Sequence, residues 1–279
     1  MPAIAGKMKS TETTPPAARQ APVSTTDPAQ GRSHGTWVLI RGLLREQRHW
    51  GRFPDLMRKA MPHCKILTLD VPGNGSRHQE ASPLNIAAAV EQLRETLSLM
   101  PDLKKPLNLL GISMGGMMVV DWAQRYPEEV NSAVLINTSL STFSPFYHRL
   151  RAANYPRILR ALWLNKQSQE SLILEMTSNK ESARRQALGE WIHIAQSKPV
   201  SKRNLFRQMV AAGRFNPPDT APAVPMLMLA SEHDRIVDVS CSQRMAKAWQ
   251  VRLKQHQRAG HDLPLDAPWW VIYQIKEWH

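Results

Sequence analysis

The chain has 279 residues, of which 42% are hydrophobic, and it carries a formal net charge of +13. This length allows one large domain or two small ones with a substantial core, and no apolar run is long enough to span a membrane. The two cysteines, Cys64 and Cys241, show neither a disulfide framework nor metal-ligand spacing, so we expect both to be reduced in a cytoplasmic protein. Residues 1–35 lack the apolar segment of a secretory signal, and their Pro, Ser, Thr and Ala content predicts a disordered tail.

Strand-like and helix-like runs alternate along most of the remaining chain. Short apolar runs predict strands at residues 36–40, 65–69, 107–110, 132–137, 224–230 and 251–256. Helical spacing predicts helices at residues 53–61, 117–123, 240–249 and 264–278. A further helix is expected to begin with Ser82 as its cap and Pro83 at its first position. This order favours right-handed crossovers and a parallel sheet, so we predict an α/β core formed by residues 36–140 and 221–279.

Residues 141–220 carry helical periodicity without a clear strand. A connection of this length is unusual in a compact domain, and we interpret it as an inserted helical cap. Thirteen Lys and Arg stand against five acidic residues between Phe143 and Thr220, an excess of eight positive charges. The excess is either an ordinary solvated surface or a means of steering an anionic substrate or acidic partner. The residues proposed for steering are Arg149, Arg151, Arg157 and Arg160.

The most informative stretch of the chain is residues 109–116, an apolar run that ends in Gly-x-Ser-x-Gly. The pattern alone is common, but here a predicted strand precedes it and a predicted helix follows it. In that context it indicates a nucleophile elbow, with Ser113 on a tight turn between strand and helix. The competing interpretation is a glycine-rich turn with an inert serine.

A serine hydroxyl is a weak nucleophile at neutral pH and needs a base, which in turn needs a third group to orient it. Asp234 and His261 follow Ser113 in chain order, and each stands on a turn after a predicted strand. Because the carboxyl ends of parallel strands meet at one edge of a sheet, these residues can meet there. We therefore predict His261 as the general base and Asp234 as the acid that orients it.

The oxyanion formed during such a reaction needs two hydrogen-bond donors that are already in place. We expect the backbone N–H of Met114, the residue after the nucleophile, to supply one. The second should come from the loop after the first strand, where Gly42 permits a tight turn and Leu43 is the expected donor.

Other residues compete for these roles. Asp238 could replace Asp234 as the acid, while His233, His256 and His49 do not follow the last strand in the order that a triad requires. Asp262, next to His261, is expected to be a solvated or helix-capping carboxylate.

These motifs together resemble those of the α/β-hydrolase superfamily, over a stretch from about Thr36 to the C-terminus. The matching segments are residues 41–43, 70–76, 111–116, 232–237 and 260–262. Arg41 is a departure, since the family usually has histidine there. The resemblance implies an α/β-hydrolase fold and hydrolysis through a serine nucleophile. A serine at this position argues against the dehalogenase and epoxide-hydrolase branches, which have aspartate there.

We therefore predict a hydrolase of carboxylic esters or thioesters that forms an acyl-enzyme on Ser113, without a metal or another cofactor. The alternative substrate is an acyl group on acyl carrier protein or coenzyme A, since both are polyanionic and would suit the basic cap. A C–C hydrolase, lactonase or perhydrolase would use the same serine machinery, and a non-enzymatic binding protein of this fold would be expected to lack part of the triad. Nucleic-acid binding is disfavoured, because no nucleic-acid-binding motif accompanies the positive charge.

Overall fold

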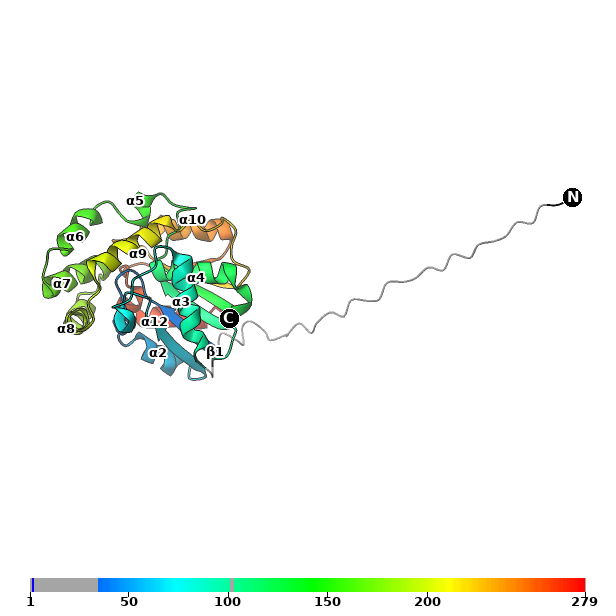
Figure 1. Ribbon diagram of the computed structural model, residues 1–279, viewed down its shortest axis with the longest axis horizontal. Coiled ribbons are helices and arrows are strands. Elements are labelled where there is room, and N and C mark those ends of the chain that lie inside the picture. The colour runs from blue at the N-terminus through cyan, green and yellow to red at the C-terminus, as the bar shows by residue number, and fades with distance from the viewer. Residues whose placement is uncertain (1, 3–34, 101–102, 279) are drawn as a thin grey trace.

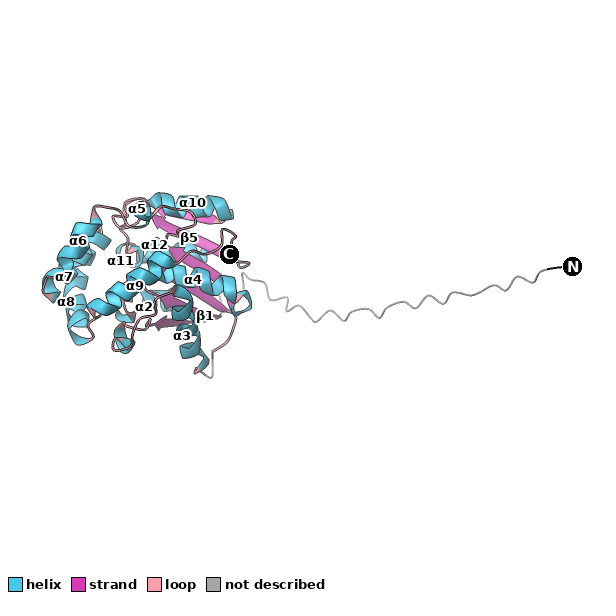
Figure 2. Cartoon of the chain, turned by 45° about the horizontal axis from the view of Figure 1, so that its top comes forward, coloured by secondary structure: helices cyan, strands magenta, loops and turns pink. Residues whose placement is uncertain are grey.

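The computed structural model describes residue 2, residues 35–100 and residues 103–278. The predicted tail, residues 1–35, therefore lies outside the described residues apart from its second and last positions. The described chain forms one sheet with helices on both faces and a group of further helices at one end (Figures 1 and 2).

The sheet is parallel throughout and has the strand order β2-β1-β3-β4-β5-β6. Its strands are β1 (Gly35–Ile40), β2 (Cys64–Leu69), β3 (Leu107–Ile112), β4 (Val130–Ile136), β5 (Met226–Ser231) and β6 (Arg252–His256). The predicted α/β fold is confirmed. Because β1 lies between β2 and β3, the direction in which strands are added reverses beside β1, and a crevice is expected at the carboxyl ends of β1 and β3.

Alternate residues of the strands enter two separate buried clusters. Trp37 and Leu39 of β1 pack with α2 and α12, whereas Val38 and Ile40 pack with α3, α4 and α10. This alternation follows from the period of two in a strand, and it requires both faces of β1 to be apolar. The helices on the two faces are α2 (Phe53–Ala60), α3 (Ile86–Ser98), α4 (Met114–Arg125), α10 (Val239–Trp249), α11 (Leu263–Asp266) and α12 (Pro268–Lys276). Short 3-10 helices occur at η1 (Gln47–Trp50), η2 (Gly75–Arg77) and η3 (Pro127–Glu129).

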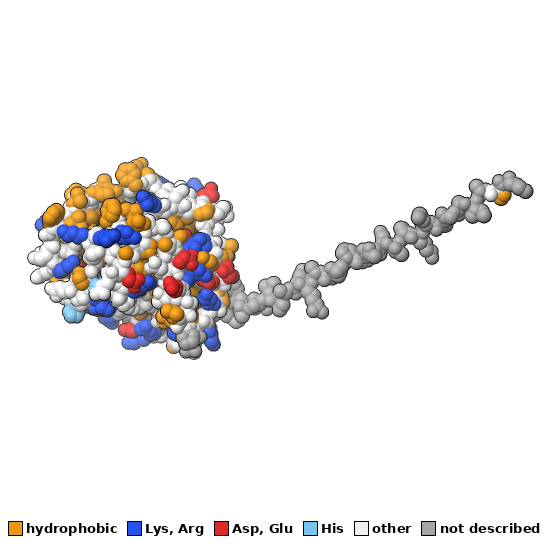
Figure 3. All heavy atoms as spheres, viewed as in Figure 1, with side chains coloured by type: hydrophobic (Ala, Val, Ile, Leu, Met, Phe, Trp, Pro, Cys, Tyr) orange, Lys and Arg blue, Asp and Glu red, His pale blue; other side chains and the backbone are white. Residues whose placement is uncertain are grey.

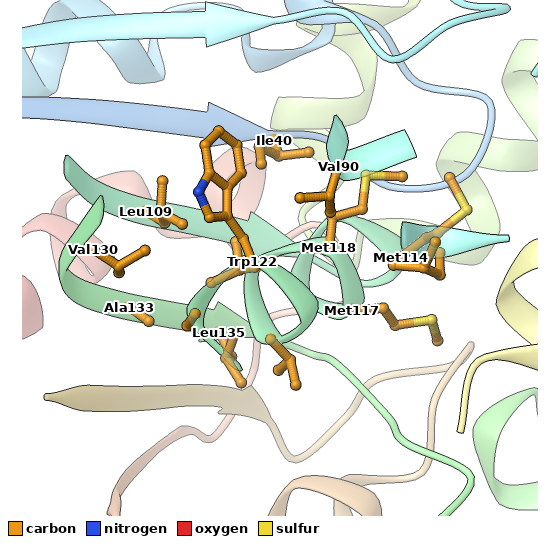
Figure 4. Packing of buried hydrophobic residues seen from close by; sticks show 14 of the residues in the cluster. Ile40, Val90, Leu109, Met114, Met117, Met118, Trp122, Val130, Ala133 and Leu135 are labelled. Atoms are coloured by element: carbon orange, nitrogen blue, oxygen red, sulfur yellow. The ribbon is translucent and has the colours of Figure 1, made fainter. Parts of the chain in front are cut away.

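Helix α4 lies directly on the sheet. Figure 4 shows Trp122 and Met118 of α4 directed among side chains of β1 and β3, including Ile40 and Leu109. The indole Nε1 of the fully buried Trp122 donates a hydrogen bond to Glu129 at 2.9 Å, so its polar atom is satisfied. The helix is buried along most of its length, which anchors its first residue, the one after Ser113.

Two predicted helix boundaries were wrong. Asn85 caps α3, because its side chain accepts a hydrogen bond from the backbone of Ala88 at 2.7 Å. Ser82 is instead buried and donates to the Pro72 carbonyl at 2.8 Å. The predicted closing helix is split between α11 and α12, because Pro268 has no N–H and restricts the residue before it.

Five helices between β4 and β5 form the group at the end of the sheet, and we call residues 146–214 the cap. They are α5 (Phe146–Arg149), α6 (Asn154–Ala161), α7 (Lys166–Thr177), α8 (Glu181–Ser197) and α9 (Lys202–Arg214). Leu174 and Trp191 belong to a small buried cluster that joins α7 to α8. Among the helices of the described residues, none is long and apolar enough to cross a membrane.

Candidate active site

Ser113 occupies a strained turn between β3 and α4. Its backbone has φ 56° and ψ −120°, outside the regions that L-residues commonly adopt, which costs on the order of 1–3 kcal/mol. The turn is possible only because its neighbours are small: a Cβ on Gly111 would lie 2.4 Å from the Gly115 carbonyl oxygen, and one on Gly115 would lie 2.2 Å from that of Ile40. This is the geometry of a nucleophile elbow, and it leaves the serine half-buried at the end of β3.

Asp234 and His261 are in direct contact. The Nδ1 atom of His261 lies 2.7 Å from Oδ2 of Asp234, and both residues are buried. The other carboxylate oxygen accepts hydrogen bonds from the backbone of Ile236 at 2.7 Å and Val237 at 3.0 Å, which holds the carboxylate in one orientation. Because a carboxylate can only accept, Nδ1 carries the hydrogen and Nε2 of the neutral ring is left as an acceptor.

Ser113 and His261 line the same cavity, which has a volume of about 360 Å³. The cavity lies between the carboxyl ends of the strands and the cap, and most of its wall is apolar. Side chains from the cap and from α4 form that wall, among them Met117, Ile158, Leu162, Ile173, Met176 and Leu205. A cavity of this size and lining suits an apolar group of a small molecule, held beside a few polar residues.

The predicted oxyanion residues lie on this cavity as well. Leu43 and Met114 both line it, and a Cβ on Gly42 would lie 3.1 Å from the Ser113 Cβ, so the two loops are in contact. Met114 is the first residue of α4, where a backbone N–H has no acceptor inside the helix. The next residue after Leu43, Leu44, has φ 62° and donates its N–H to Gln208 of α9 at 3.0 Å. The cap therefore fixes the turn that carries Leu43.

Asn137, which the sequence reasoning missed, holds the loop of His261. It follows β4 with φ 46°, a region in which Asn is enriched. Its Nδ2 donates to the His261 carbonyl oxygen at 2.8 Å, and its Oδ1 accepts from the backbone of Ser231 at 2.8 Å. The sequence feature that could have pointed to Asn137 is a polar residue directly after a buried strand.

Arg41 and Asp262 form a buried ion pair beside the catalytic candidates. Nη1 and Nη2 of Arg41 lie 3.1 Å and 2.6 Å from the two carboxylate oxygens, and each side chain is only 3% exposed. The expectation that Asp262 would be solvated or cap a helix was therefore wrong. Since Arg41 precedes Gly42 and Asp262 follows His261, the pair connects the loop of Leu43 to the loop of His261.

The competing acid and bases lie in other surroundings. Asp238 caps α10 through the backbone of Ser240 at 3.0 Å, and its other oxygen pairs with Arg151 at 3.2 Å. His256 accepts hydrogen bonds from the backbone of residues 258 and 259, and His233 is exposed. Asp234 is thus the carboxylate in contact with His261.

His49 belongs to a second, more polar cavity of about 390 Å³, which shares Leu44 and Arg45 with the first. Arg45 pairs there with Glu170 of α7 at 2.8 Å. Burial, and next the Arg45 cation, lower the pKa of His49 well below 6.5, so its ring is neutral at pH 7. No group of three or more His, Cys, Asp or Glu that could hold a metal ion occurs within the part of the chain that the structure describes.

The four candidate arginines of the cap do not share one environment. Arg149 is half-buried on the cavity wall and donates to the Ala212 carbonyl at 2.7 Å, and burial lowers the pKa of its guanidinium. Arg151 is the partner of Asp238. Arg157 and Arg160 are exposed on α6. The structure therefore leaves two of the four available at the surface.

Known proteins with similar sequences include lipases and esterases. Monoacylglycerol lipase ABHD6 of Mus musculus is 23% identical over 242 residues, which cover 83% of this chain and 71% of that protein. The pimeloyl-acyl-carrier protein methyl ester esterase of Neisseria meningitidis serogroup C is 30% identical over 122 residues, 42% of each chain. A solved structure described as a membrane phospholipase A, a bacterial virulence factor, has a TM-score of 0.70 at 21% identity and covers 88% of this chain and 78% of that one. At this identity the structural likeness shows the fold.

The family is shown by a sequence profile. The profile described as serine aminopeptidase, S33 (Hydrolase_4) matches residues 35–267, which is most of the chain. The resemblance to α/β-hydrolases found in the motifs is therefore confirmed. The chain belongs to the serine aminopeptidase S33 family and is an α/β-hydrolase enzyme.

Proposed function

We propose that this protein hydrolyses carboxylic esters with an apolar acyl group, through an acyl-enzyme on Ser113. The observation that carries the proposal is the 2.7 Å contact between His261 and Asp234 on the same cavity as a serine held in an elbow. The names of the relatives support an ester as the substrate, since they are a monoacylglycerol lipase and a methyl ester esterase.

In the proposed reaction, Oγ of Ser113 attacks the ester carbonyl while Nε2 of His261 takes its proton. Asp234 keeps the imidazole in the required tautomer and stabilises the imidazolium. His261 then gives the proton to the leaving alcohol, and the acyl group remains on Ser113. A water molecule then attacks the acyl-enzyme while Nε2 of His261 takes its proton, and His261 gives that proton to Oγ of Ser113 as the carboxylic acid is released.

The negative charge on the carbonyl oxygen would be stabilised by the backbone N–H groups of Leu43 and Met114. Both residues line the cavity beside Ser113, and backbone donors need no reorganisation during the reaction. Arg41 stands where the family usually has histidine. Its side chain is paired with Asp262 and does not enter the loop, so the backbone N–H of Leu43 can still act as a donor.

The cavity favours an acyl chain over a charged group next to the scissile bond. Its wall is mainly Leu, Ile and Met, and burial of each methylene contributes about 0.8 kcal/mol. We therefore expect kcat/KM to rise with acyl-chain length until the cavity of about 360 Å³ is filled.

The test is hydrolysis of p-nitrophenyl esters of increasing chain length, together with labelling by a serine-directed fluorophosphonate. The wild-type protein should be labelled and should turn over the esters, whereas Ser113→Ala should lose both properties with unchanged folding. His261→Ala should reduce turnover to a similar extent, because triad members act as a unit. Ser98→Ala, at the exposed end of α3, is the matched control. Full labelling of the Ser113→Ala protein would contradict the proposal.

The second candidate substrate is an acyl group carried by acyl carrier protein or coenzyme A. It is favoured by the similarity to the pimeloyl-acyl-carrier protein methyl ester esterase and by the exposure of Arg157 and Arg160. Reversing both charges should then slow hydrolysis of the carrier-linked ester much more than that of a neutral ester. Equal rates on the carrier-linked ester before and after the change would remove this candidate.

A further inference from the structure

Exposed hydrophobic side chains are concentrated on the cap. Among the described residues, eleven large hydrophobic side chains are exposed, and seven of them lie in the cap. Figure 3 shows hydrophobic side chains gathered over α5 and α6, with a row of Lys and Arg side chains next to them. Contiguous apolar surface of this kind marks an interaction site. The seven residues, which we call the docking patch, are Phe146, Tyr147, Tyr155, Leu159, Trp163, Phe206 and Met209.

Helix α6 is apolar on two sides. Tyr155, Leu159 and Trp163 follow one another at intervals of four residues, so they form one stripe along the helix and the turn after it. Ile158 and Ala161, from the intervening positions, line the catalytic cavity. The inner side is explained by the cavity, but Leu159 and Trp163 of the outer stripe, which are 60% and 84% exposed, do not line that cavity and have no such explanation.

Positive charge accompanies this stripe. The segment from Phe143 to Gln169 contains four arginines and one lysine and has no acidic residue. Arg157 and Arg160 are exposed on α6, and Nζ of Lys202 lies 4.9 Å from the centre of the Trp163 ring. The surface is therefore a band of aromatic and aliphatic side chains bordered by cations.

The docking patch also borders the entrance to the catalytic cavity. Phe146, Tyr155 and Met209 are members of the patch and, at the same time, line the cavity that contains Ser113. Whatever covers the patch therefore lies next to the cavity. An apolar molecule could pass from it into the cavity without crossing water.

We propose that the docking patch binds the surface of an anionic phospholipid bilayer, a property that goes beyond ester hydrolysis. Aromatic side chains with a polar edge, such as Trp163 and Tyr155, are favoured at the boundary between acyl chains and headgroups. Basic side chains beside them are attracted by anionic lipid, at about 1 kcal/mol each. Apolar area and positive charge together are the combination that holds a protein in the interface.

Charge favours a bilayer over a second copy of the chain. Pairing two docking patches would bring Arg157 and Arg160 of both copies close together, and the flanking segment has no acidic residue to compensate them. An anionic bilayer supplies the opposite charge and an apolar layer in one surface.

Binding is tested with the full chain carrying Ser113→Ala, so that the result does not depend on hydrolysis. The protein is sedimented with vesicles of phosphatidylcholine and phosphatidylglycerol in equal amounts, and with vesicles of phosphatidylcholine alone. We expect strong binding to the first and at least tenfold weaker binding to the second. Arg157→Glu with Arg160→Glu should weaken binding to the anionic vesicles at least tenfold, as should Trp163→Ser with Leu159→Ser.

Matched controls use exposed residues on helices away from the docking patch. Trp269→Ser with Tyr273→Ser, on α12, and Arg58→Glu with Lys59→Glu, on α2, should leave binding within twofold of the Ser113→Ala protein. Equal loss in the controls would show non-specific adsorption and overturn the proposal. The proposal would also be overturned if the protein did not bind vesicles and instead formed a dimer that Trp163→Ser with Leu159→Ser dissociates. It would equally be overturned if the protein did not bind vesicles and instead formed an arginine-dependent complex with acyl carrier protein.

Discussion

The ion pair between Arg41 and Asp262 allows a quantitative prediction. Among the described residues, Asp262 is the only carboxylate that forms an ion pair with Arg41. Asp262→Ala removes this carboxylate and leaves the Arg41 cation buried. Removing one partner of such a pair costs about 3–5 kcal/mol of unfolding free energy. The Trp50 ring lies 4.8 Å from the guanidinium carbon before the substitution and remains after it, so this cation–π contact does not reduce the difference.

The free energy of unfolding is measured by urea denaturation at pH 7, from the midpoint of the transition and the slope m. The control is Asp55→Ala, which removes an ion pair with Arg58 whose side chains are 72% and 50% exposed. An exposed pair contributes about 0–1 kcal/mol, so the control should differ little from the wild type. If Asp262→Ala were as mild as Asp55→Ala, the buried pair would not contribute to stability as described.

A double variant separates stability from activity. Replacing Arg41 by Met and Asp262 by Leu removes both charges and keeps the volume apolar, which should recover more than half of the stability lost in Asp262→Ala. If the pair also orients the loops of Leu43 and His261, kcat for a p-nitrophenyl ester should stay low in the double variant. Recovery of kcat together with stability would refute a positioning role for the pair.

Three further changes test the framework around Ser113. Asn137→Ala should lower kcat at least tenfold with little change in KM, because the His261 carbonyl loses its donor. Gly115→Ala should prevent soluble expression or greatly lower the urea midpoint, because its Cβ would lie 2.2 Å from a backbone oxygen of β1. A hydrogen bond from Arg94 lowers the pKa of Glu129 from 4.5 to about 2, so its stabilisation is complete above pH 4.5 and lost as pH falls toward 2. Glu129→Gln should therefore be less stable than the wild type at pH 7, by on the order of 3 kcal/mol, with the difference shrinking at pH 3.

The features that the sequence predicted are those determined by short segments. Strand and helix types follow from apolar periodicity, and the sharp turn at Ser113 follows from the small residues two positions before and after it. The contact between Asp234 and His261 could also be predicted, because parallel strands bring their carboxyl ends to one edge.

The contacts that it did not predict join residues far apart in the chain. Arg41 and Asp262 are separated by 221 positions, and nothing in either local sequence indicates the other. Ser82 was expected at the N-terminal capping position of a helix, but its backbone N–H instead donates a hydrogen bond to the side chain of Asn204 in α9 at 3.0 Å. Tertiary contacts of this kind override a local capping preference, and only the folded chain reveals them.

The same long-range contacts determine how the cavity can open. The backbone of Asp262 donates to the Thr177 carbonyl at the end of α7 at 2.8 Å, and that of Arg151 donates to Ile236 at 2.9 Å. Gln208 of α9 holds Leu44. The cap is thus hydrogen-bonded to the loops that carry His261, Asp234 and Leu43. Swinging the whole cap away would break these bonds and disturb the loops of the proposed catalytic residues, so substrate should enter past the side chains of α5, α6 and α9, where the docking patch lies.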